Sequence, residues 1–169
     1  MGRKLLPVEQ ILDLLAETPR RIATLTADLK SAQLHTAPDH DEWSANDMLA
    51  HLRSCADVWG GCIATMLAED HPTIRAINPR TWIKQTDYPE LEFRSSLRAF
   101  TAQRDKLLTV LEPLPGDDWS RAATVTGAGN PLERTVHTYA AWLARHERSH
   151  YKQIERIASA VCGWPRPSR

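Results

Sequence analysis

The chain contains four long segments in which apolar residues recur every three or four positions, and nearly all of its strong helix breakers lie between these segments. Apolar residues at this spacing line one side of an α-helix, whereas a strand would alternate every second residue. The segments span about residues 7–30, 44–69, 89–111 and 130–161. Helices of this kind bury their apolar sides against one another. The sequence therefore predicts an all-α fold, a four-helix bundle with long loops between helices 2, 3 and 4.

Several residues predict where these helices begin and end. Ser44 and Asp47 form a capping box, and Asn130-Pro131 provides a cap followed by a proline at the first helical position, so helices are expected to begin at both places. Pro19 is expected either to kink the first helix or to divide it. The glycine-rich, β-prone stretch 123–129 is expected to form a small extended turn.

Length and charge limit the domain organisation and the classes of partner. A chain of 169 residues with 42% hydrophobic content can build one proper core. We therefore expect a single domain over residues 1–169, with its core at about 5–161 and a short C-terminal tail. The 21 basic and 21 acidic residues cancel, which argues against binding to nucleic acid or to a membrane surface and favours a small molecule or a protein as partner.

The cysteines and the absence of long apolar runs predict a cytoplasmic protein. Cys55, Cys62 and Cys162 form an odd set in a chain large enough to fold without disulfides, so reduced thiols are expected. Glu9 and Asp13 interrupt the N-terminal region before a signal-peptide core could form. No stretch approaches the roughly 20 apolar residues that cross a bilayer.

Histidines interrupt the apolar sides of two of the predicted helices. His146 and His150 stand four positions apart in the last segment, so their rings project from one side of the helix, one turn apart. His51 stands in the apolar stripe of the second segment. Three neutral imidazoles from two helices suit zinc, nickel, iron or manganese and leave a coordination position open. We predict a divalent metal site on these three histidines, although a histidine is often simply a hydrogen-bonded core or surface residue.

The sequence His-Glu-Arg-Ser-His at residues 146–150 matches a metalloprotease pattern, in which two histidines hold zinc and the glutamate is the general base. The following residues contradict that interpretation, because no glycine and histidine extend the motif and Glu155 is the only later carboxylate. The protease interpretation is disfavoured. Glu147 is expected at a solvated helix position, with a role beside the metal as the alternative.

Other residues near the predicted site have simpler explanations. Cys55, one turn after His51, could be a fourth ligand but is expected to be a small buried residue. Asp47 could orient His51, yet its capping role already explains it. The tryptophans near these segments are expected to be core or loop anchors, with pocket lining as the alternative: Trp43, Trp59, Trp82 and Trp142. The remaining histidines are not assigned to the site: His35, His40, His71 and His137.

Together these motifs resemble the DinB/YfiT-like superfamily of metal-binding four-helix bundles. The resemblance rests on Glu42-Trp43-Ser44, on His51-Leu52 and on the late segment 130–154, and it extends over about residues 5–160. It implies a metal triad at His51, His146 and His150. Because some members are thiol-dependent transferases or isomerases, it also implies thiol chemistry with a low-molecular-weight thiol, and a homodimer.

The leading hypothesis is therefore a metal-dependent enzyme of the thiol S-transferase, isomerase or hydrolase type. The ion, zinc or nickel in the first place and manganese or iron otherwise, would lower the pKa of a bound water or thiol. The alternative is a non-enzymatic bundle with a structural or vestigial metal site that acts as an interaction module.

Overall fold

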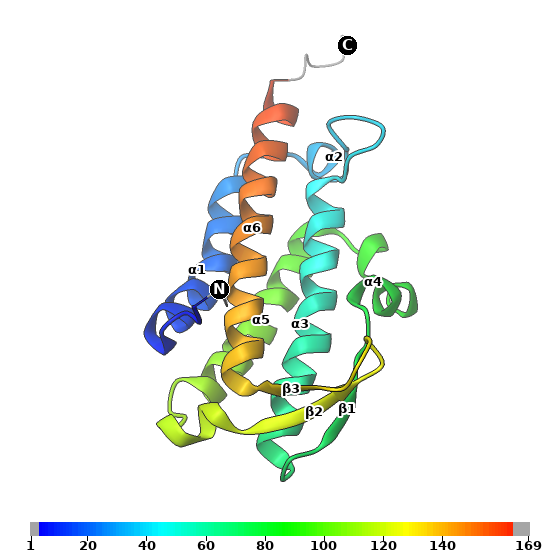
Figure 1. Ribbon diagram of the computed structural model, residues 1–169. Coiled ribbons are helices and arrows are strands. Elements are labelled where there is room, and N and C mark those ends of the chain that lie inside the picture. Colours follow the sequence, from blue (N-terminus) through cyan, green and yellow to red (C-terminus); the bar gives the residue numbers. More distant parts are fainter. Residues whose placement is uncertain (1–3, 164–169) are drawn as a thin grey trace, which may run out of the picture.

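Four long helices form a bundle in the computed structural model, which describes residues 4–163 (Figure 1). They are α1 (Val8–Thr26), α3 (Ala45–Ala68), α5 (Phe93–Leu111) and α6 (Val136–Cys162). Helix α6 packs along both α1 and α3, and α5 packs against the same two helices from the other side. The predicted four-helix bundle is confirmed. The predicted C-terminal tail lies outside the described residues.

The long connections contain short helices and a small sheet. The short helices are α2 (Ser31–Leu34), α4 (Pro79–Trp82) and the 3-10 turns Ile83–Gln85, Tyr88–Glu90 and Gly116–Ser120. The strands β1 (Thr73–Arg75), β2 (Ala122–Thr126) and β3 (Leu132–Thr135) form one sheet in that order, with β1 parallel and β3 antiparallel to β2. In register, Thr124 lies opposite Thr73 on one side and Glu133 on the other. The sheet crosses the lower end of the bundle (Figure 1).

The predicted start of the last helix at Asn130 is wrong. Leu132–Thr135 pairs with β2, and α6 begins only at Val136, where the hydroxyl of Thr135 accepts a hydrogen bond from the backbone N–H of Thr138. The cap signal at Asn130-Pro131 involves only neighbouring residues. Pairing with the β-branched strand Ala122–Thr126 outweighs it, because the strand provides hydrogen-bond partners for backbone N–H groups that would have none in the first turn of a helix.

The other predicted boundaries are close, with two differences. Helix α3 begins after Ser44, whose hydroxyl accepts from the N–H of Asp47 in the predicted capping box. The first helix ends at Thr26 instead of about residue 30, and the third begins at Phe93 instead of about residue 89. The later start follows from Glu92, whose carboxylate caps the N–H groups of the first turn of α5.

Helix α1 continues through Pro19, and a side chain from α5 replaces the hydrogen bond that the proline cannot donate. Proline has no N–H, so the carbonyl of Leu15 lacks its usual helical donor. Arg104 on α5 donates to that carbonyl at 3.4 Å and also pairs with both carboxylate oxygens of Glu147 on α6. These two charged side chains are only 2% and 0% exposed. A buried ion pair therefore ties α1, α5 and α6 together.

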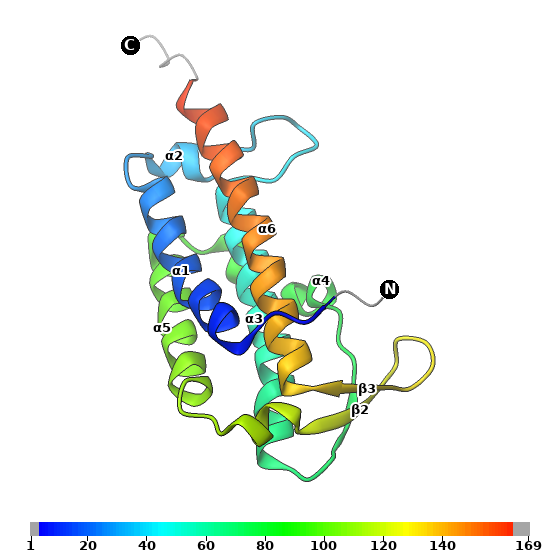
Figure 2. The same cartoon turned by 60° about the vertical axis from the view of Figure 1, so that its left-hand side comes forward.

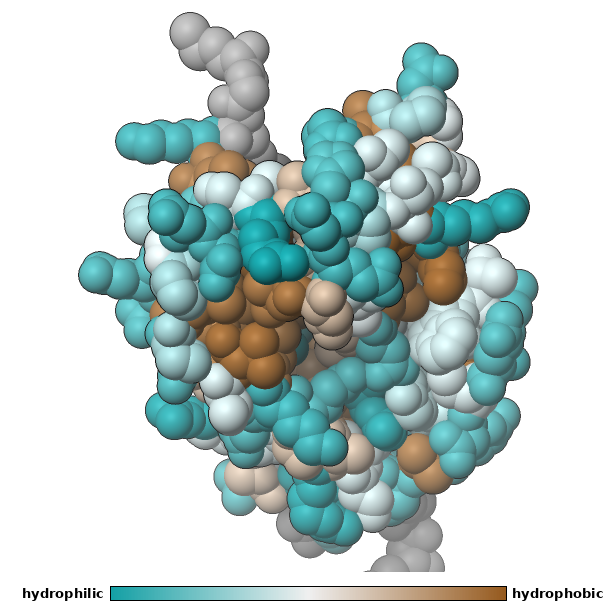
Figure 3. Space-filling model, turned by 90° about the horizontal axis from the view of Figure 1, so that it is seen from below, coloured by the Kyte–Doolittle hydropathy of each residue, from teal (hydrophilic) through white to brown (hydrophobic). Residues whose placement is uncertain are grey.

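The N-terminal segment before α1 lies across α6 (Figure 2). The carbonyl of Lys4 accepts a hydrogen bond from Arg145, and the carbonyl of Leu6 lies 2.6 Å from Nε2 of His137. His137 is thus engaged outside the predicted metal site. Seen from below, apolar surface occurs in separate areas bordered by hydrophilic side chains (Figure 3). Among residues 4–163, no helix combines the length and apolar character of a membrane span.

Candidate metal centre

Three histidine rings meet between α3 and α6. Nε2 of His146 lies 3.4 Å from Nε2 of His51 and 2.9 Å from Nε2 of His150. Two nitrogen atoms bound to one zinc ion at about 2.05 Å would be about 2.9 Å apart at a right angle and about 3.4 Å apart at the tetrahedral angle. Each separation is therefore one that two ligands of a single divalent ion can have, and His146 is common to both pairs.

Hydrogen bonding indicates which ring nitrogens are available. Nδ1 of His150 lies 2.8 Å from Oε1 of Gln153, so this nitrogen carries the proton and Nε2 is left with a free lone pair. Nδ1 of His146 is buried without a hydrogen-bond partner in the described part of the chain, which leaves Nε2 as its interacting nitrogen. In both rings the nitrogen that faces the cluster is thus Nε2.

Burial keeps these rings neutral at physiological pH. Burial, together with charge on the neighbouring His150, lowers the pKa of His51 to about 4 and that of His146 to about 3. The pKa of His150 is lowered as well, again mainly by burial. A neutral imidazole is the form that binds metal. The site is therefore prepared to take a cation without first releasing protons from these rings.

Cys55 is fully buried, as expected, and lies beside the histidines. Its Sγ lies 3.6 Å from Nε2 of His51, and donor atoms of His51, Cys55 and His146 all lie within 4.8 Å of one another. Sulfur and nitrogen ligands on one tetrahedral zinc would be about 3.6 Å apart, given bonds of about 2.3 and 2.05 Å. Burial raises the pKa of this thiol to about 12, so binding through sulfur would require loss of a tightly held proton.

The solvated position expected for Glu147 is wrong, because this side chain is fully buried in its ion pair with Arg104. The core-facing stripe of α6 agrees with the sequence pattern at Leu143 and Ile154, but between them it runs through Glu147 and Tyr151. His146 and His150 stand at its edge and are half-buried. Glu147 is thus held on the α1 and α5 side, whereas the histidines face α3.

Two aromatic rings and one arginine surround the histidines. The ring of Trp43 lies edge-on to that of His51 at 5.3 Å, and the ring of Trp59 lies edge-on to that of His146 at 4.9 Å. Arg80 on α4 places its guanidinium 5.7 Å from the Trp43 ring, and its charge contributes to the low pKa of His51. No pattern in the sequence pointed to Arg80, because it comes from the long loop between α3 and α5.

Asp57 of α3 holds that loop in place. Its carboxylate accepts from Nε1 of Trp82 at 3.0 Å, from the hydroxyl of Tyr88 at 2.7 Å and from Gln103 at 2.6 Å. Trp82 is therefore a loop anchor, as expected. The Ser54 hydroxyl also donates to the carbonyl of Pro79, the residue before Arg80. These bonds fix the position of Arg80 beside the histidines.

A cavity of about 420 Å³ lies beside the histidine cluster. His146 forms part of its wall, together with Trp142, Arg145 and Leu5 of the N-terminal segment. His146 is therefore the residue of the cluster that borders this cavity. Trp142 lines this cavity and corresponds to the pocket-lining alternative for the tryptophans. Trp59 belongs to the hydrophobic core, as expected, and also contacts His146.

The remaining polar candidates lie outside the cluster. Asp47 is exposed, and its carboxylate accepts from the N–H and the hydroxyl of Ser44, so it caps the helix. His40 pairs with exposed aspartates, and His71 contacts Thr124 and Glu133 on the sheet. Within residues 4–163, the structure therefore brings together His51, His146, His150 and Cys55.

Comparison with known proteins gives the chain a family. The sequence profile of the DinB superfamily matches residues 14–154. The chain belongs to the DinB superfamily. Among solved structures, this DinB-superfamily chain is similar to YfiT from Bacillus subtilis, with a TM-score of 0.80, 17% identity and coverage of 98% of this chain and 94% of YfiT. YfiT is described as a probable metal-dependent hydrolase with an unusual four-helix bundle topology. No protein of curated function matches the sequence.

Proposed function

We propose that this DinB-superfamily protein is a metal-dependent enzyme in which His51, His146 and His150 hold one divalent transition metal and an open coordination position faces the cavity. The observation that carries the proposal is the meeting of the three rings at Nε2 of His146, at 3.4 and 2.9 Å, in the wall of a 420 Å³ cavity. When bound, such an ion supplies the Lewis acidity that lowers the pKa of water or a thiol.

The protein orients the histidine rings, shields them from solvent and places a positive charge beside them. Gln153 holds the tautomer of His150, and burial among aromatic rings keeps all three imidazoles neutral. Arg80 places a positive charge beside the cluster, where it would attract an anionic nucleophile or a developing negative charge on the substrate. Hydrolysis is the favoured reaction because YfiT is described as a probable hydrolase, and transfer of a low-molecular-weight thiol uses the same activation.

The position of Cys55 supports a second candidate, a structural metal site. A structural zinc site is closed by four protein ligands, and Cys55 lies at the separation from His51 that a fourth ligand would have. In that case the metal would stabilise the fold and no position would remain for substrate. Burial raises the pKa of Cys55 to about 12 in the metal-free protein, so a closed site would require the ion itself to displace the thiol proton.

Metal analysis of untagged protein, purified without nickel resin, tests both candidates. We expect about one transition metal per chain, retained in His40→Ala, whose ring is exposed and distant from the cluster, and lost in His51→Ala and in His146→Ala. Absence of metal in the wild-type protein, even after incubation with zinc or nickel, would refute the proposal.

Cys55→Ser separates the open site from the closed one. If the site is open and formed by three histidines, Cys55→Ser should keep its metal. The cobalt-loaded wild-type protein should then show no sulfur-to-metal charge-transfer band. A closed site should show that band and should lose most of its affinity in Cys55→Ser. A chelator should then lower the melting temperature sharply, as expected for a structural ion.

A further inference from the structure

A second cavity, of about 520 Å³, lies beside the histidine cluster between α3 and α6. The strands β2 and β3, with the turn that joins them, and the connection from β1 to α4 form its outer walls. This volume falls within the roughly 300–1,000 Å³ that is typical of small-molecule sites. Two residues, Arg134 and Trp142, line both this cavity and the 420 Å³ cavity at His146. The larger cavity is therefore the neighbour of the cavity that His146 lines.

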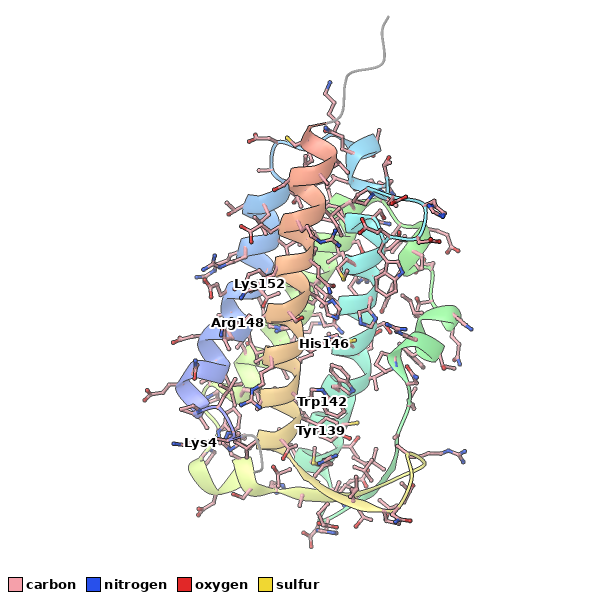
Figure 4. All side chains as sticks on the ribbon, turned by 45° about the horizontal axis from the view of Figure 1, so that its top comes forward. Lys4, Tyr139, Trp142, His146, Arg148 and Lys152 are labelled. Atoms are coloured by element: carbon pink, nitrogen blue, oxygen red, sulfur yellow. The ribbon has the colours of Figure 1, made fainter. Side chains whose placement is uncertain are left out.

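A row of aromatic rings connects the larger cavity with the histidines. The Trp142 ring stacks on Tyr139 at 6.1 Å and on Trp59 at 4.9 Å, and Trp59 in turn contacts His146. Tyr139, Trp142 and His146 follow one another along the same side of α6, away from Arg148 and Lys152 (Figure 4). Trp142 remains 46% exposed despite its two stacking partners. Its free surface is available to a flat ligand.

Arg134 is the single charged residue in the wall of the larger cavity. It is half-buried and makes no side-chain hydrogen bond or ion pair within residues 4–163. Its neighbour Glu133 is bonded to Thr124 and lies near His71, so strand alternation sends these two side chains of β3 to opposite faces of the sheet. The other half-buried arginines all donate side-chain hydrogen bonds to protein oxygens: Arg53, Arg94, Arg121 and Arg145.

We propose that the larger cavity binds the substrate of the metal-dependent reaction, and that this substrate is a planar, largely apolar carboxylate. The ring system would lie against Trp142, the carboxylate would pair with Arg134, and the rest of the molecule would extend past Trp142 toward His146. An apolar wall with one unpaired guanidinium matches one carboxylate on an apolar body, because arginine binds a carboxylate through two parallel hydrogen bonds. A polyanion would leave charge unpaired against apolar side chains.

This inference rests on the proposed function for the role of the bound molecule, but its test does not require metal. The probes are 2-naphthoate and its neutral analogue 2-naphthalenemethanol, and calorimetric titration measures the affinity of each. We expect the wild-type protein to bind 2-naphthoate about 10- to 100-fold more tightly than 2-naphthalenemethanol. This is the factor expected for hydrogen bonds to a charged group. Arg134→Gln should remove this difference and leave the affinity for the alcohol unchanged. Trp142→Leu should weaken both ligands.

Two further variants make the result specific. Arg75→Gln removes an exposed arginine of the same sheet that does not line the cavity, and it should preserve the preference for 2-naphthoate. His51→Ala should lose metal and keep 2-naphthoate binding, so a failure of the metal proposal is distinguishable from a failure of this one. Equal affinity for acid and alcohol, a preference that survives Arg134→Gln in a folded variant, or no binding of 2-naphthoate at millimolar concentration would overturn the inference.

Discussion

The buried pair of Arg104 and Glu147 offers the sharpest test of how the bundle is held together. Replacing Arg104 with methionine keeps the length of the side chain and leaves a carboxylate that is 0% exposed without a cation. Removing one partner of such a pair costs about 3–5 kcal/mol, because the remaining charge is neither solvated nor paired. For a protein of this size about 1 kcal/mol corresponds to roughly 2–4 °C. We therefore expect a melting temperature lower by about 6–20 °C.

The double variant Arg104→Met with Glu147→Leu separates the cost of the unpaired charge from the value of the pair. Removing both charges eliminates the desolvation penalty, which by itself makes such replacements neutral or stabilising. The carbonyl of Leu15 still loses its donor, at a cost of about 1–3 kcal/mol. We expect the double variant to be within about 2 kcal/mol of the wild-type protein and clearly more stable than Arg104→Met.

Urea unfolding followed by circular dichroism measures these free energies, and Arg148→Met is the matched control. Arg148 is exposed and next to Glu147 in sequence, so its replacement should change stability by less than about 0.5 kcal/mol. The reasoning is refuted if Arg104→Met loses less than about 1 kcal/mol, or if the double variant is as unstable as the sum of its single changes. Metal content should be unchanged in the double variant, since the histidines face α3.

Two further predictions concern stability. The metal-free protein should lose stability as pH falls below about 6.5, because the pKa of His51 is lowered to about 4 and that of His146 to about 3 in the folded state; the unfolded chain then binds protons that the folded chain does not. Urea titrations at pH 7.5 and 5.5 measure this, and equal free energies would contradict it. Gly127→Ala should cost about 1–2 kcal/mol, because Gly127 has φ of 86° and an added Cβ would lie 3.2 Å from Cγ of Arg75. Gly60→Ala, on α3 with open space around it, should instead stabilise by about 0.5–1 kcal/mol, and the same sign for both variants would contradict the reasoning.

The parts of the fold that the sequence predicted are those that depend on nearby residues. Apolar spacing located all four long helices, and the capping box at Ser44 located the start of α3 within one residue. The sheet was missed because its pairs are remote in sequence, with Thr73 opposite Thr124. The helix start predicted at Asn130 failed for the same reason, since the competing partner, β2, comes from another segment.

The candidate site was predictable to the extent that it lies on helices. His51, His146 and His150 were selected by their helical spacing, and the structure brings their rings together. Glu147 was misplaced because the middle turn of α6 buries the neighbour of His146 instead of His146 itself, and because its buried partner Arg104 lies 43 residues away. Apolar spacing does not identify a charged residue that is buried by such a remote partner.

The helices that carry the histidines and the segments that line the larger cavity differ in how readily their sequences can change, and this difference affects substrate specificity. The proposed metal donors lie on α3 and α6, whose positions are fixed by the packed core and by the Arg104–Glu147 pair. The outer walls of the 520 Å³ cavity come from the β1–α4 connection and the β2–β3 hairpin, which are the segments that apolar periodicity does not specify. Loops and short strands tolerate change more readily than packed helices. Relatives that keep the three histidines can therefore bind different substrates, and residues such as Arg134 are a better guide to the substrate than the metal site itself.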